Sequence, residues 1–322
     1  MRAIVMHQTG GPEVLRLEEI PAPEPGPGQL LVRVEAIGVS FFETQMRAGG
    51  LPLPVPLPAV PGAEAAGTVT AAGAGADPGL IGQQVAVLTG GTGSYAEYAA
   101  VPAVMATVLP GGVSPADAVA AAPAAVALGL LEKAALAGGE TVLAESAASS
   151  VGGYLVQLAR EAGAGKVIAT AGTPARREHA RKLGADIVLD HARPGWPQAL
   201  REALGGPAVD VAFESIGGPS AQQVAGTLTP GTGRMLCYGN LSGEPAAVDL
   251  SALRASGVTV TGCGGPAWFG HVLGRCRPEI FRRLAEGRLR PLPATILPLD
   301  QATAAHQRIE DHAALGKIVL VP

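Results

Sequence analysis

Short apolar runs alternate with clusters of glycine and proline along the first third of the chain. Four of these runs are rich in apolar and β-branched residues and are bounded by turn residues, which is typical of short strands. They lie at 3–6, 30–38, 67–71 and 84–88. Two proline-rich segments, 21–28 and 50–62, are unsuited to a helix interior or a central strand and are expected to be ordered loops. Residues 1–112 therefore predict an irregular, mainly β domain.

From about residue 113 to residue 265 the pattern changes to a repeated order of strand, turn and helix. One helix is predicted to begin with Thr173 as its N-cap and Pro174 at its first position, and to end at Gly184. Six apolar runs with helical patterns between most of them predict a parallel, doubly wound sheet and hence an α/β protein. These runs lie at 141–144, 166–171, 187–190, 209–214, 234–239 and 258–262.

The last stretch, 266–322, predicts a helix near 278–287 and a final strand at 317–321. The order of elements along the chain leaves open whether this stretch rejoins the first domain or stands alone. The strand at 258–262 is β-branched and is expected at the edge of the sheet, where unpaired backbone groups invite pairing with a second copy of the chain. A covered edge in a monomer is the alternative. Proline at Thr259 or Thr261 is expected to split such a homodimer.

Composition excludes several classes of protein. The chain is 48% hydrophobic and only 16% charged, which argues against disorder, and its net charge of −4 argues against binding to nucleic acid or an anionic membrane. The most apolar run, 118–131, is shorter than a bilayer span, and the first residues contain no signal-peptide core. Three cysteines in no ligand spacing argue against disulfides and metal. A soluble, cytoplasmic protein is expected.

A turn of small residues carries the first chemical argument. Ala147, Ser149 and Gly152 occupy the three glycine positions of the fingerprint G-x-G-x-x-G, between the first strand and the first helix of the α/β stretch. Such a turn lets backbone N–H groups and the start of the helix approach the pyrophosphate of a dinucleotide. A tight crossing without a ligand is the alternative reading of the turn alone, and its place in a six-strand run favours the cofactor.

The end of the second strand distinguishes the two nicotinamide cofactors. NAD sites place an acidic residue there for the ribose hydroxyl, and residues 168–175 contain none. Thr170, Gly172, Thr173, Arg176 and Arg177 follow or end the strand instead, and guanidinium groups suit a 2′-phosphate. The turn and the arginines therefore favour NADPH, with an ordinary solvated helix face as the alternative.

Several longer segments, in order, carry a family resemblance. They include MRAIVMHQTGGPEVLRLEEIPAPEPGPGQLLVRVEAIGVS at the start, PGAEAAGTV, GSYAEYAAVP, ETVLAESAASSVGGYLVQLAR, VDVAFESIGG, GRMLCYGNLSG and the closing LGKIVLVP. On these segments the sequence resembles the zinc-independent, zeta-crystallin-like quinone oxidoreductases of the medium-chain dehydrogenase/reductase superfamily. The resemblance implies a GroES-like catalytic domain at 1–112, completed by 266–322. It also implies an NADPH-binding Rossmann domain at 113–265, with the cofactor in the cleft between the domains.

The same resemblance predicts that no metal is bound. Zinc-dependent relatives carry Gly-His-Glu where this chain has Gly62, Ala63 and Glu64, and a cysteine or its equivalent where this chain has Ser40. The imidazole ligand is absent, and the chain has no quartet of cysteines for a structural zinc site. Glu64 is therefore expected to be a structural carboxylate.

The cofactor turn and the resemblance together predict the cofactor contacts. His191 is included because it ends the third strand, where the family often has tyrosine near the adenine ribose. The predicted contacts are Val126, Ser149, Ser150, Val151, Gly152, Thr170, Gly172, Thr173, Arg176, His191, Ser215, Tyr238, Gly239, Asn240 and Lys317.

Ser40 and Gln45 are the predicted catalytic residues, because each can donate a hydrogen bond to a carbonyl oxygen on which charge develops. Packing within the loop is the alternative. Quinone reductases of this type usually have asparagine and tyrosine at these two positions and often threonine at Val126, so quinone specificity stays open. Four aromatic residues are predicted to line a pocket for a flat, apolar substrate, with core packing as the alternative. They are Phe41, Phe42, Trp268 and Phe269.

The resemblance thus implies an NADPH-dependent, metal-independent reductase that transfers hydride to a small apolar quinone or α,β-unsaturated carbonyl. Two alternatives remain. One is a reductase of enoyl thioesters or polyketide intermediates, and the other is an NADPH-binding protein without turnover.

Overall fold

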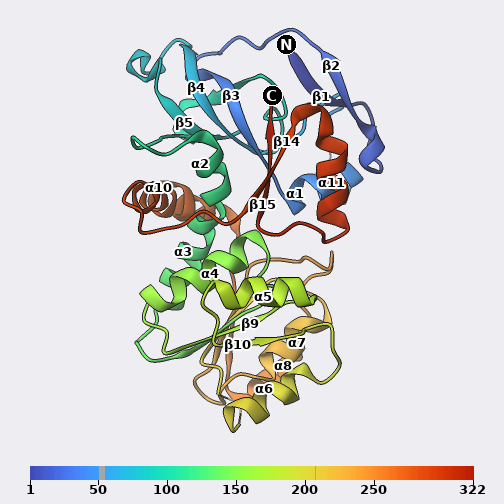
Figure 1. Cartoon of the computed structure of the whole chain (residues 1–322), viewed down its shortest axis with the longest axis vertical. Coiled ribbons are helices and arrows are strands. Elements are labelled where there is room, and N and C mark those ends of the chain that lie inside the picture. Colours follow the sequence, from blue (N-terminus) through green and yellow to red (C-terminus); the bar gives the residue numbers. More distant parts are fainter. Residues whose placement is uncertain (51–54, 207) are drawn as a thin grey trace. The chain divides into compact units, whose positions relative to one another are not determined.

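The computed structural model describes residues 1–50, 55–206 and 208–322, and the chain divides into two compact units (Figure 1). The first unit comprises Met1–Ala122 and Arg277–Pro322, and the second comprises Pro123–Cys276. Part of the proline-rich segment predicted as a loop, residues 51–54, lies outside the described residues. The rest of that segment contains no helix and meets other strands only at isolated bridges, such as the one between Ala59 and Met6.

The first unit is built on a mainly antiparallel sheet in the order β14-β15-β3-β4-β5-β7, with β6 also paired to β3 and with β1 and β2 as a separate pair. Its strands are β1 (Arg2–Met6), β2 (Leu15–Glu19), β3 (Gln29–Val39), β4 (Glu64–Ala72), β5 (Gln84–Leu88), β6 (Tyr98–Pro102), β7 (Ala106–Val108), β14 (Ala294–Pro298) and β15 (Lys317–Val321). Its α-helices are α1 (Phe41–Ala48), α2 (Pro115–Ala121), α10 (Arg277–Ala285) and α11 (Ala302–Glu310).

Strand β15 resolves the question that chain order left open. It pairs with β14 on one side and with β3 on the other, so the last stretch of the chain rejoins the first domain inside its sheet. Alternate residues of β3 (Leu30, Val32 and Val34) are buried in the core of this unit, as expected for a strand with one face inward. Ile318 of β15 joins the same core.

The second unit contains the predicted parallel sheet of six strands, in the order β10-β9-β8-β11-β12-β13. The strands are β8 (Thr141–Ala144), β9 (Lys166–Thr170), β10 (Ile187–Leu189), β11 (Val211–Glu214), β12 (Arg234–Cys237) and β13 (Thr259–Gly262). The helices are α3 (Pro123–Ala134), α4 (Ser150–Glu161), α5 (Pro174–Lys182), α6 (Trp196–Leu204), α7 (Pro219–Ala225), α8 (Leu250–Ser256) and α9 (Gly265–His271), and a π-helix, Val272–Cys276, follows α9. The α/β class and the doubly wound sheet are confirmed.

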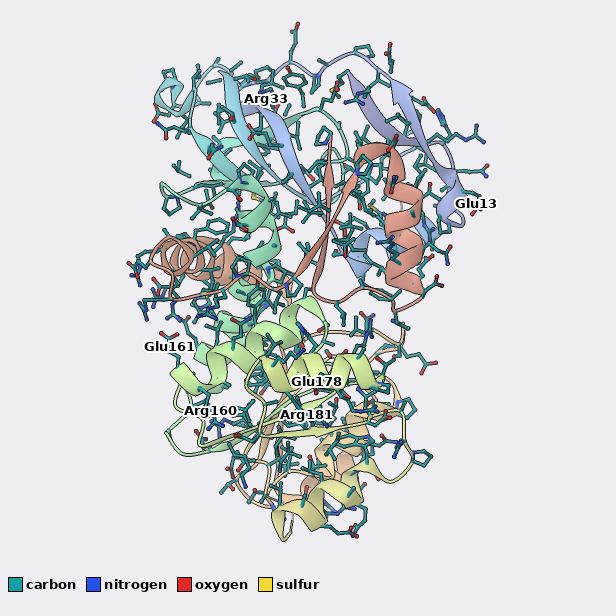
Figure 2. All side chains as sticks on the ribbon, in the orientation of Figure 1. Glu13, Arg33, Arg160, Glu161, Glu178 and Arg181 are labelled. Atoms are coloured by element: carbon teal, nitrogen blue, oxygen red, sulfur yellow. The ribbon has the colours of Figure 1, made fainter. Side chains whose placement is uncertain are left out.

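The strand register assembles the core of this sheet. Leu143, Ile168, Ala212 and Met235 stand opposite one another on neighbouring strands, so their side chains form a row on one face. Residues of α6 and α7 cover this row. Helices α4 and α5 carry charged residues into solvent, among them Arg160, Glu178 and Arg181 (Figure 2). These helices are therefore amphipathic.

The unit boundaries lie about one helix later than the bounds 1–112, 113–265 and 266–322. Helix α2 contacts β3, β4 and β5 and so belongs with the first unit. Helix α9 and the π-helix belong with the second unit, because the π-helix contacts α3. Packing partners, which the sequence pattern does not specify, decide both boundaries.

Among the described residues, one helical stretch, Pro115–Ala134, is long and apolar enough by length and composition to cross a bilayer. It exceeds the apolar run at 118–131 because only Ala122 separates α2 from α3. The helical stretch is therefore longer than the apolar run within it. Of its most apolar 18-residue window, 61% is buried, as expected for a core helix.

Candidate functional site

The carboxyl ends of the parallel strands gather the predicted cofactor residues at one edge of the second sheet. The chain runs outward from β8 to β9 and β10 and then returns to β11 on the other side of β8. The point where the strand order reverses is the usual ligand site of such sheets. It lies between β8 and β11, and the residues that follow these two strands are Glu145 and Ser215.

The small-residue turn after β8 needs a glycine at only one of its three fingerprint positions. A Cβ on Gly152 would lie 2.5 Å from the Ser146 carbonyl oxygen, so α4 could not approach the turn with any other residue there. Ser149 has φ −76°, which any residue adopts, and its Oγ accepts a hydrogen bond from the Gly152 N–H at 3.1 Å as the N-cap of α4. The serine therefore replaces glycine without backbone strain. The N–H groups of the first turn, which begins with Ser150 and Val151, have no partners within the helix.

The ends of β9 and β10 are joined by side chains. Thr170 Oγ1 lies 3.0 Å from His191 Nδ1 and accepts a hydrogen bond from the Ser146 N–H at 3.2 Å. A Cβ on Gly172 would lie 3.1 Å from His191 Nε2, so the glycine leaves room for the imidazole. The structure thus brings three predicted cofactor residues, Thr170, Gly172 and His191, together beside the turn.

Arg176 and Arg177, in the first turn of α5, differ in their surroundings. Thr173 caps α5 as predicted, because its Oγ1 accepts a hydrogen bond from the Arg176 N–H at 3.3 Å. Arg177 Nη1 lies 2.6 Å from Asp190 Oδ2, and both side chains are largely buried. The guanidinium of Arg177 is therefore committed to Asp190 rather than to a phosphate, since the end of β10 lies beside α5. Burial lowers the pKa of Arg176, whose side chain is half-buried.

Two buried glutamates at the reversal point are functional candidates that sequence reasoning missed. Glu145 Oε2 accepts hydrogen bonds from the N–H groups of Ser215 (2.9 Å) and Ile216 (3.0 Å), and its Oε1 accepts one from Ser220 Oγ at 2.6 Å. Glu145 therefore fastens the loop after β11 to the end of β8. The signal was an acidic residue directly after an apolar strand, in the sequences TVLAE and VAFE.

Glu214, the second of these glutamates, ends β11 and accepts a hydrogen bond from the Gly217 N–H. Burial, and then the neighbouring charge of Glu145, raise the pKa of Glu214 to about 7. Burial and the charge of Glu214 raise the pKa of the Cys237 thiol to about 12, so this thiol is no nucleophile at neutral pH.

The loop after β12 carries the remaining predicted contacts of this edge. Burial raises the pKa of the Tyr238 phenol well above its ordinary value. A Cβ on Gly239 would lie 2.8 Å from the Ser215 carbonyl oxygen, so this glycine permits the loops after β11 and β12 to meet. Asn240 is exposed. Ser215 and Gly239 are thus in contact, as a shared site requires.

In the first unit, helix α1 holds the predicted catalytic residues. Ser40 is its N-cap and forms a capping box with Glu43, whose carboxylate accepts a hydrogen bond from the Ser40 N–H. The Ser40 hydroxyl donates to the same carboxylate. Gln45 is half-buried, one helical turn from Phe41 and Phe42, and Phe42 is 44% exposed. These three residues therefore share one part of the helix, while the hydroxyl of Ser40 is engaged with Glu43.

Comparisons with known proteins identify relatives of this chain. Residues 26–111 match the family "Alcohol dehydrogenase GroES-like domain", and residues 150–274 match "Zinc-binding dehydrogenase". The chain is 32% identical to a 2-haloacrylate reductase of Burkholderia sp over 99% of the chain and 98% of that protein. The chain belongs to the medium-chain dehydrogenase/reductase superfamily. It is an oxidoreductase.

Two further relatives of this superfamily are similar over nearly the whole chain. The crystal structure of Escherichia coli quinone oxidoreductase complexed with NADPH is 30% identical, with a TM-score of 0.91 and full coverage of both chains. A mycocerosic acid synthase-like polyketide synthase of Mycolicibacterium smegmatis is 31% identical over 98% of this chain, which corresponds to 15% of that protein.

The residues at the positions of the superfamily's catalytic zinc ligands do not fit that ion. Glu64 Oε2 lies 3.0 Å from Lys317 Nζ, so an ammonium group neutralises the carboxylate that would face a metal. Ala63 offers only its backbone N–H, which donates to Glu43 Oε1 at 3.1 Å. Ser40 Oγ is bound to the same carboxylate. Lys317, a predicted cofactor contact, is 5% exposed and forms this ion pair instead of standing open to solvent.

The last predicted residues lie on helices of the second unit. Val126 is half-buried on α3. Trp268 and Phe269 lie on α9, and Phe269 is 54% exposed. Trp268 lines a cavity of about 490 Å³ together with Glu132 and His271. The four aromatic residues predicted for one pocket are thus divided between the two units, two in each.

Proposed function

We propose that this oxidoreductase acts in the cytoplasm and transfers hydride from NADPH to the conjugated carbon of a quinone or α,β-unsaturated carbonyl compound. One observation carries the proposal. At the carboxyl edge of the second sheet, a glycine-dependent turn leads into a twelve-residue helix, and residues 171–175, directly after β9, contain no acidic residue. The similarity to a quinone oxidoreductase complexed with NADPH supports the same cofactor.

The residues of this edge fit the parts of NADPH. The first turn of α4 offers N–H groups and the positive end of the helix dipole to the pyrophosphate. At Gly152 and at Gly239 a Cβ would collide with a neighbouring backbone carbonyl, so these glycines let the backbone segments lie close together. The turn therefore leaves room for a ligand. Arg176 is the candidate for the 2′-phosphate, because Arg177 already binds Asp190. The imidazole of His191, held by Thr170, is the candidate beside the adenine ribose.

Bound NADPH would supply the hydride. The chain's own part is to stabilise the negative charge that develops on the carbonyl oxygen of the substrate. The Gln45 amide is the stronger candidate donor, since the Ser40 hydroxyl already donates to Glu43. Ser40 would then position helix α1 through its capping box, and Phe41 and Phe42 would offer apolar contact to a flat substrate.

A reductase of enoyl thioesters is a second candidate function. The polyketide synthase relative favours it, because 98% of this chain aligns with one part of that longer protein. The reductase of 2-haloacrylate favours a carbon–carbon double bond next to a carboxylate as a third form of the same conjugated acceptor. All three acceptors place the developing charge on carbonyl or carboxylate oxygen, so they share the requirement for a donor such as Gln45.

The test is NADPH oxidation by the purified chain with four acceptors: a 1,4-benzoquinone, an enone, 2-chloroacrylate and an enoyl thioester. NADPH and NADH binding is measured separately by titration. Turnover with the quinone or enone, at higher kcat/KM than with the thioester, supports the proposal. Preference for the thioester supports the second candidate. Tight NADPH binding without turnover of any acceptor identifies a binding protein and overturns both.

A further inference from the structure

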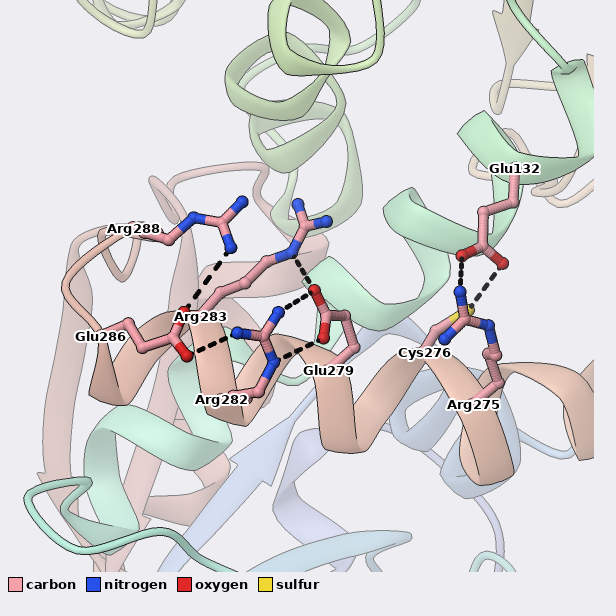
Figure 3. A network of polar contacts seen from close by, with 8 residues as sticks. All are labelled: Glu132, Arg275, Cys276, Glu279, Arg282, Arg283, Glu286 and Arg288. Atoms are coloured by element: carbon pink, nitrogen blue, oxygen red, sulfur yellow. Dashed lines mark hydrogen bonds and ion pairs between the residues drawn. The ribbon is translucent and has the colours of Figure 1, made fainter.

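Three side chains that the reductase does not use lie together in the second unit. They are Glu132 of α3, His271 at the end of α9, and Cys276 at the end of the π-helix, here called the α3–α9 cluster. Glu132 Oε2 lies 2.7 Å from His271 Nε2 and 3.7 Å from Cys276 Sγ (Figure 3 shows the contact with the thiol). One potential ligand atom from each residue lies within 4.8 Å of the other two. Carboxylate oxygen, imidazole nitrogen and thiol sulfur thus converge on one point.

Two local features of the backbone bring these residues together. In an α-helix, residues five apart point about 140° away from each other, so His271 and Cys276 would diverge. The intervening π-helix winds more widely, with hydrogen bonds five residues apart, and turns both side chains toward α3. Gly129 allows the approach: a Cβ there would lie 3.2 Å from the Trp268 ring and 3.5 Å from Cys276 Sγ. Such π segments are frequent at functional sites.

An ordinary ion pair does not account for the cluster. His7 and Glu18 form such a pair in the first unit, with 2.9 Å between Nε2 and Oε1 and both side chains partly in solvent. The α3–α9 cluster adds a buried thiol beside the carboxylate. Arg275 Nη2 lies 3.4 Å from the other carboxylate oxygen, Oε1, and the Arg275 side chain is 65% exposed. Oε2 therefore remains directed at the imidazole and the thiol.

The donor set selects one class of ligand. Sulfur and imidazole nitrogen favour zinc and similar transition metals over magnesium and calcium, which prefer oxygen. Cysteine, histidine and carboxylate are all zinc ligands, and zinc with three protein ligands keeps its fourth position open to water, as in catalytic zinc sites. The open side is present, because Glu132 and His271 line the cavity of about 490 Å³ beside α9.

We propose that Glu132, His271 and Cys276 bind one zinc ion, each through one atom, with water in the fourth position. On binding, a sulfur–zinc bond replaces the sulfur–hydrogen bond and the thiol proton passes to solvent, with no change in oxidation state. The ion links α3 to the segment after α9 and takes no part in hydride transfer. Spacing rules for cysteines overlook this site, since its ligands combine residue 132 with a pair five residues apart.

The experiment uses the full chain, stripped of metal and titrated with zinc against a competing chelator. Cobalt(II) titration supplies a second readout, because a thiolate ligand gives a charge-transfer band. One equivalent of zinc and a thiolate–cobalt band are expected. His271→Ala and Glu132→Gln should each weaken zinc binding by about tenfold or more, which corresponds to at least about 1.4 kcal/mol, and Cys276→Ser should abolish the cobalt band.

Two matched controls keep the proposal falsifiable. His7→Ala removes the histidine of the His7–Glu18 pair, and Cys263→Ser removes a thiol that lines the cavity without belonging to the cluster. Both should bind zinc like the parent chain. If Cys276→Ser fails to fold, the exposed His271→Ala still decides the question. Substoichiometric zinc in the parent chain, or unchanged affinity in His271→Ala, would overturn the site.

Discussion

Single side chains at the carboxyl edge of the second sheet are held in place by neighbouring groups. Glu145 holds the loop after β11, His191 and Thr170 hold each other, and Arg177 is engaged by Asp190. Because each of these groups already has a partner, the edge is ordered before any ligand arrives. Preorganised polar groups lose less entropy on binding.

The adjacent arginines Arg176 and Arg177 of α5 give the first prediction. Arg176→Ala should weaken NADPH binding by about 1–3 kcal/mol and leave NADH binding unchanged, as expected for a charge-assisted contact to a 2′-phosphate. Arg177→Ala should change the affinity for both cofactors by the same factor, because its guanidinium binds Asp190. Fluorescence titration with the two cofactors measures both variants. Equal losses of both cofactors in Arg176→Ala would contradict the assignment.

Glu214 gives a prediction about pH. Its pKa of about 7 in the folded chain lies above its ordinary value of 4.5, so the folded state holds the proton more tightly than the unfolded state. The stability from this group is complete below pH 4.5 and is lost as the pH rises through 7. The unfolding free energy of the parent chain should therefore fall between pH 5 and pH 8. In Glu214→Gln this fall should be smaller by about 1–3 kcal/mol.

Urea unfolding at several pH values measures this difference. Glu19→Gln, which removes a carboxylate from an exposed position of β2, is the control and should follow the parent chain. A parallel pH dependence of Glu214→Gln and the parent would show that the carboxyl titrates normally.

The residues also show what sequence can and cannot reveal about the site. The cap at Thr173 and the need for Gly152 were predictable, since both depend on local backbone geometry. The capping box of Ser40 and Glu43 was present as the spacing S-x-x-E and was overlooked. The pairing of Arg177 with Asp190 was not predictable in this way, because it depends on how α5 packs beside β10.

At the scale of elements, the junction between β8 and α4 determines whether a ligand can approach. Gly152→Ala would drive a Cβ to 2.5 Å from a backbone oxygen, which cannot rotate away. We expect a loss of about 1–3 kcal/mol in unfolding free energy and a lower affinity for NADPH. Gly270→Ala in α9 is the matched helical control, since its Cβ would meet nothing within 4 Å and should be neutral or stabilising. Thermal unfolding and cofactor titration compare the two.

Strand β13 lies at the edge of its sheet, as predicted, and the homodimer through this edge remains a prediction. The hydrogen bonds of β13 show which substitution would test the homodimer. The Thr259 N–H donates to Gly233 and the Cys263 N–H to Cys237, so the N–H groups at odd-numbered positions point toward β12. By alternation the Val260 N–H points to the open edge.

Val260→Pro should therefore split a homodimer while the sheet stays folded. Thr259→Pro, one of the two substitutions suggested by sequence, removes the hydrogen bond to the Gly233 carbonyl before β12 and should damage the sheet itself. Light scattering at micromolar concentration gives the mass, and circular dichroism gives the fold. A monomeric parent chain would reject the dimer.

The elements predicted from sequence are those whose pattern is local. The six parallel strands were placed within about two residues of their observed ends, because each is an apolar run between turn residues. Strands β2, β6, β7 and β14 were missed. β6 and β14 gain their definition from the neighbours with which they pair, and β7 has only three residues.

For the whole molecule, the ion pair of Lys317 and Glu64 predicts reduction without a catalytic metal. Extended dialysis against a strong chelator should leave NADPH-dependent turnover unchanged, while a zinc-dependent alcohol dehydrogenase treated in parallel loses activity. Turnover that disappears on chelation and returns with zinc would contradict this prediction. The zinc proposed for the α3–α9 cluster is outside this test, since its readout is binding.

The position of β15 in the sheet also determines the order in which the two units can fold during synthesis. A nascent chain releases all of Pro123–Cys276 before it releases the strand that pairs with β3. At about 5–20 residues per second, residues 317–321 follow the end of that unit by about 2–10 s. The unit encoded in the middle can close while the one encoded first still exposes Ile37–Val39 as an unpaired edge. Chaperones that cover such an edge would have their window of action in that interval.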